Sequence, residues 1–247
     1  MTTAYGPILA RLYDQHWSDY AQKVAPLLHG FFQTLPAFSI SPSVLDLGCG
    51  TGQLALHFLE AACPVTGLDL SEDMLFWARR NCHRFIADGQ AEFFHADIRG
   101  FDLGKTYGLV AATYNTLNHL APRDLPGCFQ STAKALAEGG IVLLDLDTGS
   151  GLKEWGDEET GEGPYGSIHV RRRFAAEDGI GRMAVEGIYG SEKFQETVVN
   201  HVHPVKHCLE LLETSGLKKA YAALANDLGR PLRDPESEKR VFLVARK

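Results

Sequence analysis

The chain has 247 residues, 45% of them apolar, and a formal net charge of -7 at neutral pH. This length and composition predict one enzyme-sized domain over residues 1–247. An acidic chain is a poor partner for nucleic acid, because neutralising phosphates usually requires a basic face. The sequence contains no apolar run of membrane-spanning length, and its first thirty residues carry charges where a signal peptide needs an apolar segment. We therefore expect a cytoplasmic protein without nucleic-acid or membrane partners.

Residues 1–36 are predicted to form a helical cap, and the most informative stretch follows at residues 44–52. It reads Val-Leu-Asp-Leu-Gly-Cys-Gly-Thr-Gly. The apolar residues predict a strand covered on both faces, and Gly48, Gly50 and Gly52 let a ligand approach the backbone. The G-x-G-x-G spacing differs from the G-x-G-x-x-G of dinucleotide sites, which disfavours a nicotinamide cofactor. The stretch therefore predicts a cofactor loop of another kind.

A helix over about residues 53–62 and a second strand ending at Asp69 complete a β-α-β unit. Asp69 follows the glycine turn by about 20 residues, where a carboxylate commonly accepts hydrogen bonds from a ribose diol. Ser71, ahead of Asp73 and Met74, is predicted to cap the next helix. Dinucleotides and S-adenosylmethionine both carry such a ribose.

These motifs resemble the class I S-adenosylmethionine-dependent methyltransferases. The first motif of that family looks like residues 44–52, the second ends like residues 67–75, and the third looks like a strand at residues 91–98. The resemblance covers residues 40–147 in motif-level detail. It implies S-adenosylmethionine as the cofactor and a Rossmann-like α/β fold. The sheet of that fold is doubly wound, seven-stranded and mostly parallel, with an antiparallel last strand and helices on both faces.

The same resemblance implies which residues contact the cofactor. The loop backbone packs against its methionine and ribose parts, the carboxylate of Asp69 binds the ribose hydroxyls, and Asp97 contacts the adenine amino group. Taken alone, Asp97 could equally be a helix cap. We expect Cys49 to pack in the loop rather than act as a nucleophile. The predicted cofactor-binding residues are Asp46, Gly48, Cys49, Gly50, Gly52, Asp69, Leu70, Met74, Asp97, Ile98 and Tyr114.

Strands and helices continue to alternate along the chain, which predicts a parallel sheet. Helices are predicted over residues 123–137 and 205–214, and further strands over residues 108–113, 139–147, 221–225 and 240–246. Asp145 and Asp147 could be interpreted as a metal-binding pair. However, the tip of the strand at residues 108–113 lacks the carboxylate that metal-dependent relatives place there. We therefore predict a metal-independent site.

Residues 148–203 interrupt this alternation. The part from 149 to 166 is rich in Gly, Glu and Asp and is predicted to be a mobile connection. Three strands at residues 168–174, 182–189 and 196–203 would form a small inserted antiparallel sheet. Such an insertion can be a lid over the site or a dimerisation surface, so a homodimer stays open. The three arginines at 171–173 predict a solvated edge strand with its charges split between two faces.

Methyl transfer to a lone pair requires mainly an in-line arrangement in a dry pocket, so the chain needs no nucleophilic triad. Residues 114–120 look like the segment at which small-molecule methyltransferases bring donor and acceptor together. Asn115 stands where Asp is common in that segment. His119 is the candidate catalytic base, and a packed or capping histidine is the alternative.

The predicted N-terminal helix carries the aromatic side chains of Tyr5, Tyr13, Trp17 and Tyr20. In the resembled family this helix folds over cofactor and acceptor. Tyr13, followed by Asp14, resembles a Tyr-Asp pair of that family. Tyr13 is therefore the second catalytic candidate, with ordinary helix packing as the alternative.

We thus expect a methyltransferase that uses S-adenosylmethionine to methylate an N or O atom of a small-molecule acceptor by in-line displacement. The alternative is a non-catalytic S-adenosylmethionine-binding or scaffold protein with the same fold. Methylation of nucleic acid or protein is disfavoured, because the segment after the fourth strand lacks an N-P-P-Y or D-P-P-Y signature. A dehydrogenase is disfavoured by the spacing of the glycine loop.

Overall fold

The large sheet of the computed structural model has seven strands, and the structure describes residues 4–156, 158–163 and 166–247. The strands are β1 (Val44–Leu47), β2 (Val65–Asp69), β3 (Ala91–His95), β4 (Tyr107–Ala112), β5 (Leu136–Asp147), β10 (Lys218–Ala223) and β11 (Arg240–Arg246). Their order is β10-β11-β5-β4-β1-β2-β3. Strands β1 to β5 pair in parallel, and β11 is antiparallel to both of its neighbours. This confirms the predicted sheet.

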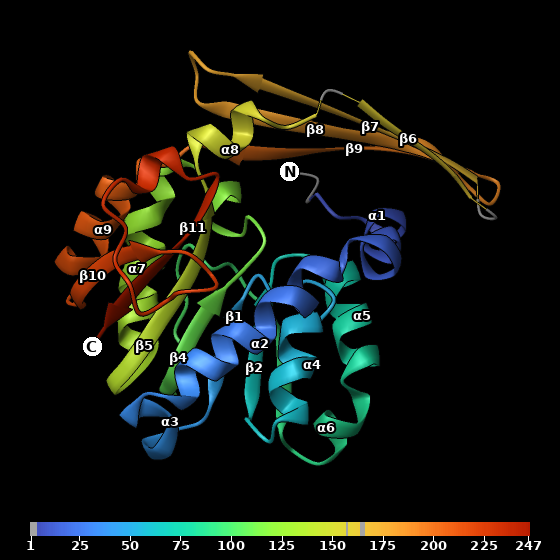
Figure 1. Ribbon diagram of the computed structural model, residues 1–247. Helices are drawn as coiled ribbons and strands as arrows, with labels where there is room; N and C mark the ends of the chain where they lie inside the picture. Colours follow the sequence, from blue (N-terminus) through green and yellow to red (C-terminus); the bar gives the residue numbers. More distant parts are fainter. Residues whose placement is uncertain (1–3, 157, 164–165) are drawn as a thin grey trace.

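Helices cover both faces of the large sheet (Figure 1). One face carries α2 (Asp19–Gln33), α3 (Pro36–Ile40), α4 (Gln53–Glu60), α5 (Glu72–Asn81) and α6 (His83–Ala87). The other face carries α7 (Leu125–Ala135) and α9 (Val205–Thr214). Alternate residues of β1 serve the two cores, since Val44 packs in the first and Leu45 in the second. None of the helices in the described part of the chain is long and apolar enough to cross a membrane.

The N-terminal cap is not one helix. It comprises α1 (Pro7–Leu12), the π-helix η1 (Tyr13–Trp17) and then α2. Tyr5 lies before α1, outside any helix, so the prediction that its ring lies on a helix was wrong. Its φ angle of 70° is left-handed, which is incompatible with a right-handed helix. The predicted cap also includes residues 1–3, which lie outside the described residues.

The inserted sheet has four strands, β6 (Glu158–Gly163), β7 (Gly166–Ala175), β8 (Ile180–Tyr189) and β9 (Glu192–His201), in that order. The predicted inserted antiparallel sheet is confirmed, and its three predicted strands correspond to β7, β8 and β9, but the prediction missed β6. A short helix, α8 (Gly149–Lys153), and β6 lie where the connection was expected. Strand β6 pairs with β7 through its backbone, so a Gly- and Glu-rich composition does not reveal it. The turns at residues 178–179 and 190–191 are confirmed.

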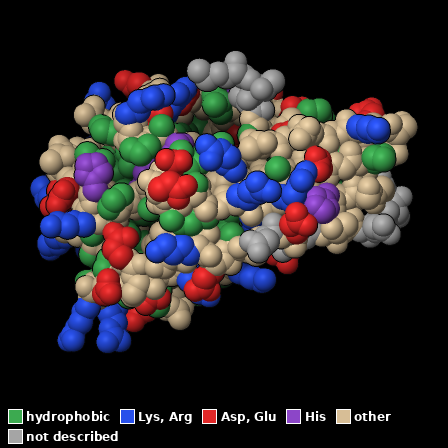
Figure 2. Space-filling view, turned by 90° about the horizontal axis from the view of Figure 1, so that it is seen from above, with side chains coloured by type: hydrophobic (Ala, Val, Ile, Leu, Met, Phe, Trp, Pro, Cys, Tyr) green, Lys and Arg blue, Asp and Glu red, His purple; other side chains and the backbone are tan. Residues whose placement is uncertain are grey.

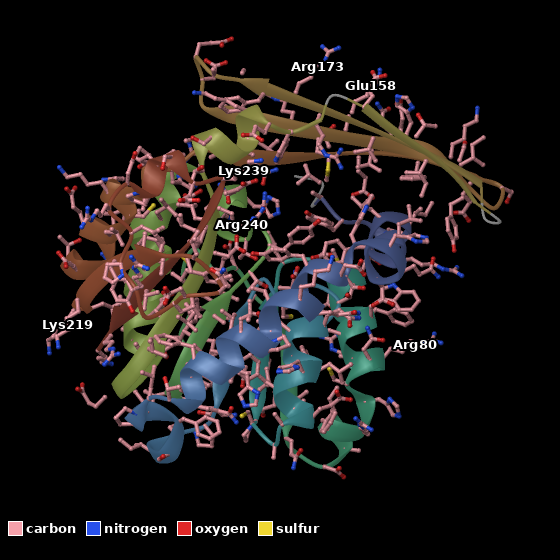
Figure 3. The ribbon with its side chains drawn as sticks, viewed as in Figure 1. Arg80, Glu158, Arg173, Lys219, Lys239 and Arg240 are labelled. Carbon is pink, nitrogen blue, oxygen red and sulfur yellow. The ribbon has the colours of Figure 1, made fainter. Side chains whose placement is uncertain are left out.

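The arginines of β7 alternate between two faces, as predicted, but β7 is not an edge strand, because β6 and β8 pair with it on both sides. Arg172 lines a cavity beneath the inserted sheet. Arg171 and Arg173 line a hollow of about 650 Å³ on its outer face. Figure 3 shows Arg173 pointing away from the core there, as does Glu158. Seen from above, basic side chains are interspersed with acidic ones on this side of the molecule (Figure 2).

The inner face of the inserted sheet packs on the N-terminal cap. Val170, Val185 and Val198 form a small core with Leu9 of α1. Apart from this core, a buried polar side chain joins the sheet to the rest of the molecule. Asn118, in the 3-10 turn η2 (Leu117–His119), is fully buried.

Both polar atoms of the Asn118 side-chain amide form hydrogen bonds. Its Nδ2 donates to the carbonyl oxygens of Asp147 at 2.8 Å and His201 at 2.9 Å, and its Oδ1 accepts from the Asp147 N–H at 2.9 Å. The ends of β5 and β9 are therefore fixed to one side chain. Such a satisfied buried network specifies one arrangement of the elements that it joins.

We predict that Asn118→Ala lowers the free energy of unfolding by about 3 kcal/mol, because it leaves several backbone groups buried without partners. The matched control is Asn226→Ala, an exposed position, for which a change within about 0.5 kcal/mol is expected. Denaturant unfolding measures both. Equal stability of the two variants would contradict this account of Asn118.

Candidate active site

Strands β1 and β2 end side by side, and the loops that follow them meet. Gly48, Gly50 and Gly52 all have left-handed φ angles, of 64°, 53° and 81°. A Cβ at Gly48 would lie 2.6 Å from the side chain of Thr116, which lies in the loop after β4, so a larger residue would separate these loops. The Gly50 N–H donates to Asp69 Oδ2 at 2.8 Å. The structure thus brings the predicted glycine loop and the predicted ribose carboxylate together.

Asp69 is held in place by backbone donors. Besides Gly50, the Ser71 N–H donates to its Oδ1 at 2.9 Å. Burial raises the pKa of Asp69, and these hydrogen bonds oppose that shift. Ser71 caps α5, as predicted, since its hydroxyl accepts from the Met74 N–H at 3.1 Å. Each Asp69 oxygen keeps acceptor capacity for a hydroxyl group, because a carboxylate has about four lone-pair directions.

Asp46 is the unusual carboxyl of the loop. It is 1% exposed, and its Oδ2 accepts no hydrogen bond from the described residues. Burial, with the nearby Asp69 charge as the second cause, raises its pKa well above the ordinary value. A buried carboxyl oxygen without a donor fits a site for a ligand with an ammonium or N–H group.

The other predicted cofactor residues differ in their surroundings. Asp97, after β3, accepts from Arg99 Nε on both oxygens, at 3.0 and 2.8 Å, and these bonds lower its pKa. Ile98 packs against the core, and Leu70 is 45% exposed. Met74 and Cys49 are buried, and burial raises the pKa of the Cys49 thiol well above its ordinary value. The thiol therefore stays protonated and is a poor nucleophile.

A cavity of about 220 Å³ lies between the ends of the central strands and the inner face of the inserted sheet. Tyr5, Tyr13 and Tyr114 are among its lining residues, and so is His119. The Tyr13 ring centroid lies 6.1 Å from that of Tyr5 and 5.9 Å from that of Tyr114. Both predicted catalytic candidates, His119 and Tyr13, therefore face the same cavity as the predicted cofactor residue Tyr114.

His119 has a defined tautomer. Its Nδ1 lies 3.1 Å from the carbonyl oxygen of Val199, which can only accept, so Nδ1 carries the proton. Its Nε2 lies 3.2 Å from the hydroxyl of Tyr5. Burial lowers the pKa of the imidazole below 6.5, so the ring is neutral at pH 7. A neutral imidazole with its basic nitrogen beside the cavity can accept a proton.

The floor of the cavity is built around Arg240, which the sequence reasoning missed. Its Nη1 donates to Asp145 Oδ1 at 2.5 Å, its Nη2 donates to Asn115 Oδ1 at 2.5 Å, and Nη2 lies 3.3 Å from Asp147 Oδ2. Figure 3 shows Arg240 between the large sheet and the inserted sheet. The antiparallel register places Arg240 opposite Asp147, so its position at the start of the last strand was the available signal.

Asp145 and Asp147 are therefore ion-paired. Tyr20 also donates to Asp145, and Trp155 Nε1 donates to Asp147 at 3.2 Å. Nowhere in the described ranges do three His, Cys, Asp or Glu side chains cluster closely enough to hold a metal ion.

The turn after β4 is strained. Tyr114 and Asn115 have φ angles of 57° and 70°, a left-handed conformation that non-glycine residues rarely adopt. The Tyr114 ring stacks on Tyr20 with 4.9 Å between centroids, and Asn115 donates to Asn200 at 3.2 Å. Strain of this kind persists only where neighbouring contacts hold it, and it is common at functional sites.

Comparison with known proteins identifies the fold and the motifs. A family model described as a methyltransferase domain matches residues 44–140. The chain is 30% identical to dTDP-3-amino-3,6-dideoxy-alpha-D-glucopyranose N,N-dimethyltransferase of Streptomyces fradiae, over 57% of this chain and 54% of that protein. It is 31% identical to dTDP-3-amino-3,4,6-trideoxy-alpha-D-glucopyranose N,N-dimethyltransferase of Streptomyces venezuelae, over 51% and 50%. The chain thus spans about half the length of these curated relatives.

A solved structure matches over the whole chain. S-adenosylmethionine-bound CalS10, described as an amino pentose methyltransferase of Micromonospora echinaspora, superposes with a TM-score of 0.68 and 19% identity. The superposition covers 100% of both chains. At this identity the similarity establishes the fold, inserted sheet included.

We predict that Asp46→Asn stabilises the ligand-free protein at pH 7 by about 2 kcal/mol and weakens binding of S-adenosylmethionine, because it removes a buried carboxyl whose Oδ2 has no partner among the described residues. The folded-state pKa of Asp46 is raised, so the wild-type carboxyl destabilises the fold only when the unfolded chain is deprotonated. The gain should be absent below about pH 4 and should grow as the pH rises above it.

Thermal unfolding over a pH series and calorimetric titration measure the two effects of Asp46→Asn. Asp88→Asn, at an exposed position, is the matched control and should change neither. A stability difference between wild type and Asp46→Asn that is constant with pH would contradict the interpretation of Asp46.

Proposed function

We propose that the chain is a class I S-adenosylmethionine-dependent methyltransferase that transfers a methyl group to an amine nitrogen of a small molecule. The observation that carries the proposal is the cavity of about 220 Å³, walled by aromatic rings and by a neutral His119. The two Streptomyces relatives are named as N,N-dimethyltransferases of amino sugars, and CalS10 is described as an amino pentose methyltransferase. These names support an amine acceptor.

S-adenosylmethionine supplies a methyl group that its sulfonium activates for attack by a lone pair. Asp69 would hold the ribose hydroxyls with its remaining lone pairs, and Asp46 would accept a hydrogen bond from the methionine part. Asp97 would contact the adenine amino group on the side that Arg99 leaves open. The orphaned oxygen of Asp46 and the glycine backbone that donates to Asp69 both support this assignment.

The cavity suits a small amine. Tyrosine and tryptophan faces attract a cationic or partly cationic nitrogen, and the amine must be neutral when it attacks. His119, uncharged at pH 7, would take up the proton that the nitrogen loses, and Tyr13 would line the acceptor pocket. The inserted sheet would act as a lid that limits the access of bulk water, since its residues Arg172 and Met183 line the cavity.

The proposed function is tested by incubating the purified protein with S-adenosylmethionine and amino sugars or simple amines, each beside its hydroxyl analogue. Formation of S-adenosylhomocysteine and of the methylated product is followed by mass spectrometry. We expect turnover with at least one amine and none with its hydroxyl analogue. Turnover with hydroxyl acceptors alone would contradict nitrogen as the acceptor atom. Cofactor binding without turnover on any acceptor would favour a non-catalytic binding protein.

We predict that Asp69→Ala weakens S-adenosylmethionine binding about 100-fold, because it removes an acceptor for two hydroxyl hydrogen bonds together with an anchor of the glycine loop. Calorimetric titration measures the loss. Asp88→Ala, which removes an exposed carboxylate, is the matched control and should bind like the wild type. Unchanged affinity of Asp69→Ala would contradict the assignment of the ribose site.

A further inference from the structure

Tyr5 is held in a left-handed backbone conformation, with φ of 70°. A non-glycine residue in this region costs about 1–3 kcal/mol and persists only where its surroundings fix it. The residue lies outside the secondary structure, so no helix or strand imposes the angle. Contacts from three separate elements fix Tyr5 instead.

Two of these contacts hold the backbone of Tyr5. Its N–H donates to Oε2 of Glu196 at 2.7 Å, and the Gly6 N–H donates to the same oxygen at 3.0 Å. Its carbonyl oxygen accepts from the hydroxyl of Ser71 at 2.7 Å. Glu196 belongs to β9 of the inserted sheet, and Ser71 caps α5 two residues after Asp69. The backbone of Tyr5 is thus tied both to the proposed lid and to the proposed cofactor site.

The third contact is made by the side chain. The Tyr5 hydroxyl lies 3.2 Å from Nε2 of His119, and the two rings are 5.8 Å apart. Nδ1 of His119 carries a proton and donates a hydrogen bond to the carbonyl oxygen of Val199. Nε2 is therefore an acceptor, and the Tyr5 hydroxyl is the donor. Burial keeps this hydroxyl protonated, since it raises the pKa of Tyr5. The basic nitrogen of His119 therefore already has a partner, while the Tyr5 oxygen retains two lone pairs.

We propose that Tyr5 is a catalytic residue that relays the acceptor's proton to His119, with Glu196 as the residue that positions it. In this step an N–H bond of the protonated acceptor nitrogen breaks, its electron pair stays on nitrogen, and an O–H bond forms on Tyr5. The original O–H bond of Tyr5 breaks, and an N–H bond forms on Nε2 of His119. Two protons move for a net transfer of one, so the acceptor amine and Tyr5 end neutral and His119 becomes an imidazolium. The proposal rests on the proposed function.

A purely structural role would not need the hydroxyl, because the backbone contacts to Glu196 and Ser71 survive in a phenylalanine variant. The relay gives the Tyr5 hydroxyl a function. It also explains why Glu196 of the inserted sheet binds the backbone of Tyr5. The relay also requires that Tyr5 and His119 act as one unit. Their effects on kcat should therefore not multiply, as the effects of two independent residues would.

The test compares Tyr5→Phe, His119→Gln and the double variant. We expect each single variant to lower kcat about 100-fold, and the double variant to lose no more than either single one. The acid limb of the kcat profile, set by His119 and lying below pH 6.5, should be present in the wild type and absent in Tyr5→Phe. Tyr221→Phe, which deletes a hydroxyl that donates to Leu228 far from the cavity, is the matched control and should resemble the wild type.

Glu196 is tested by a pair of variants. Glu196→Ala should lower kcat about tenfold, because the Tyr5 and Gly6 N–H groups lose their acceptor, and Glu196→Gln should restore most of it, because an amide oxygen still accepts. A kcat of Tyr5→Phe within twofold of the wild type, or losses that multiply in the double variant, would overturn the relay.

An outcome without any turnover in the wild type would refute the proposed function rather than the relay. In that case the relay is tested by NMR on the nitrogen resonances of His119, a measurement that needs no turnover. Its Nε2 signal should move toward that of a free imidazole nitrogen in Tyr5→Phe and stay in place in Tyr221→Phe. Identical signals in the wild type and Tyr5→Phe would overturn the relay as well.

Discussion

The ion pairing of the half-buried Arg240 with two buried carboxylates is the interaction on which the rest of the site depends. Asp145 is fully buried and Asp147 nearly so, and two such charges at the end of one strand need a cation beside them. The guanidinium satisfies both, and it lies 4.9 Å from the Tyr20 ring centroid and 5.9 Å from that of Tyr114. Removing one member would leave a buried charge alone, which typically costs about 3–5 kcal/mol. One side chain thus fixes the strand end, the N-terminal cap and the turn after β4.

The inserted sheet is attached to this floor through polar side chains. Asn118 binds the backbone at the ends of β5 and β9, and Asn200 of β9 accepts from Asn115, which itself binds Arg240. The wall and floor of the cavity therefore form one connected network. For methyl transfer this matters, because the enzyme contributes chiefly by holding donor and acceptor in line, and small displacements are costly. Rigidity in the polar floor is a direct means of such positioning.

Sequence reasoning found what is encoded locally. The strand, glycine loop and Asp69 follow from residue types at fixed spacing, and the sheet follows from the alternation of apolar segments. It missed Arg240, Asn118 and Glu196, because each acquires its role from a partner 83 to 191 residues away in the sequence. It also missed β6, since an edge strand held by backbone pairing need not have an apolar pattern. The prediction that Tyr5 lies on a helix was wrong for a related reason. The sequence around Tyr5 does not indicate that its backbone is left-handed ahead of α1.

The site keeps two kinds of polar group that have opposite energetic consequences. Asn118 and Arg240 each bind several partners, and they stabilise one arrangement of the elements around the cavity. Among the described residues, Oδ2 of Asp46 has no donor, and Tyr5 has a strained backbone, and both features lower the stability of the fold. The two costs occur where a ligand would contact the protein, whereas the satisfied groups lie around them. A protein selected for stability alone would remove both, so their position supports the proposed roles of Asp46 in binding and of Tyr5 in proton transfer.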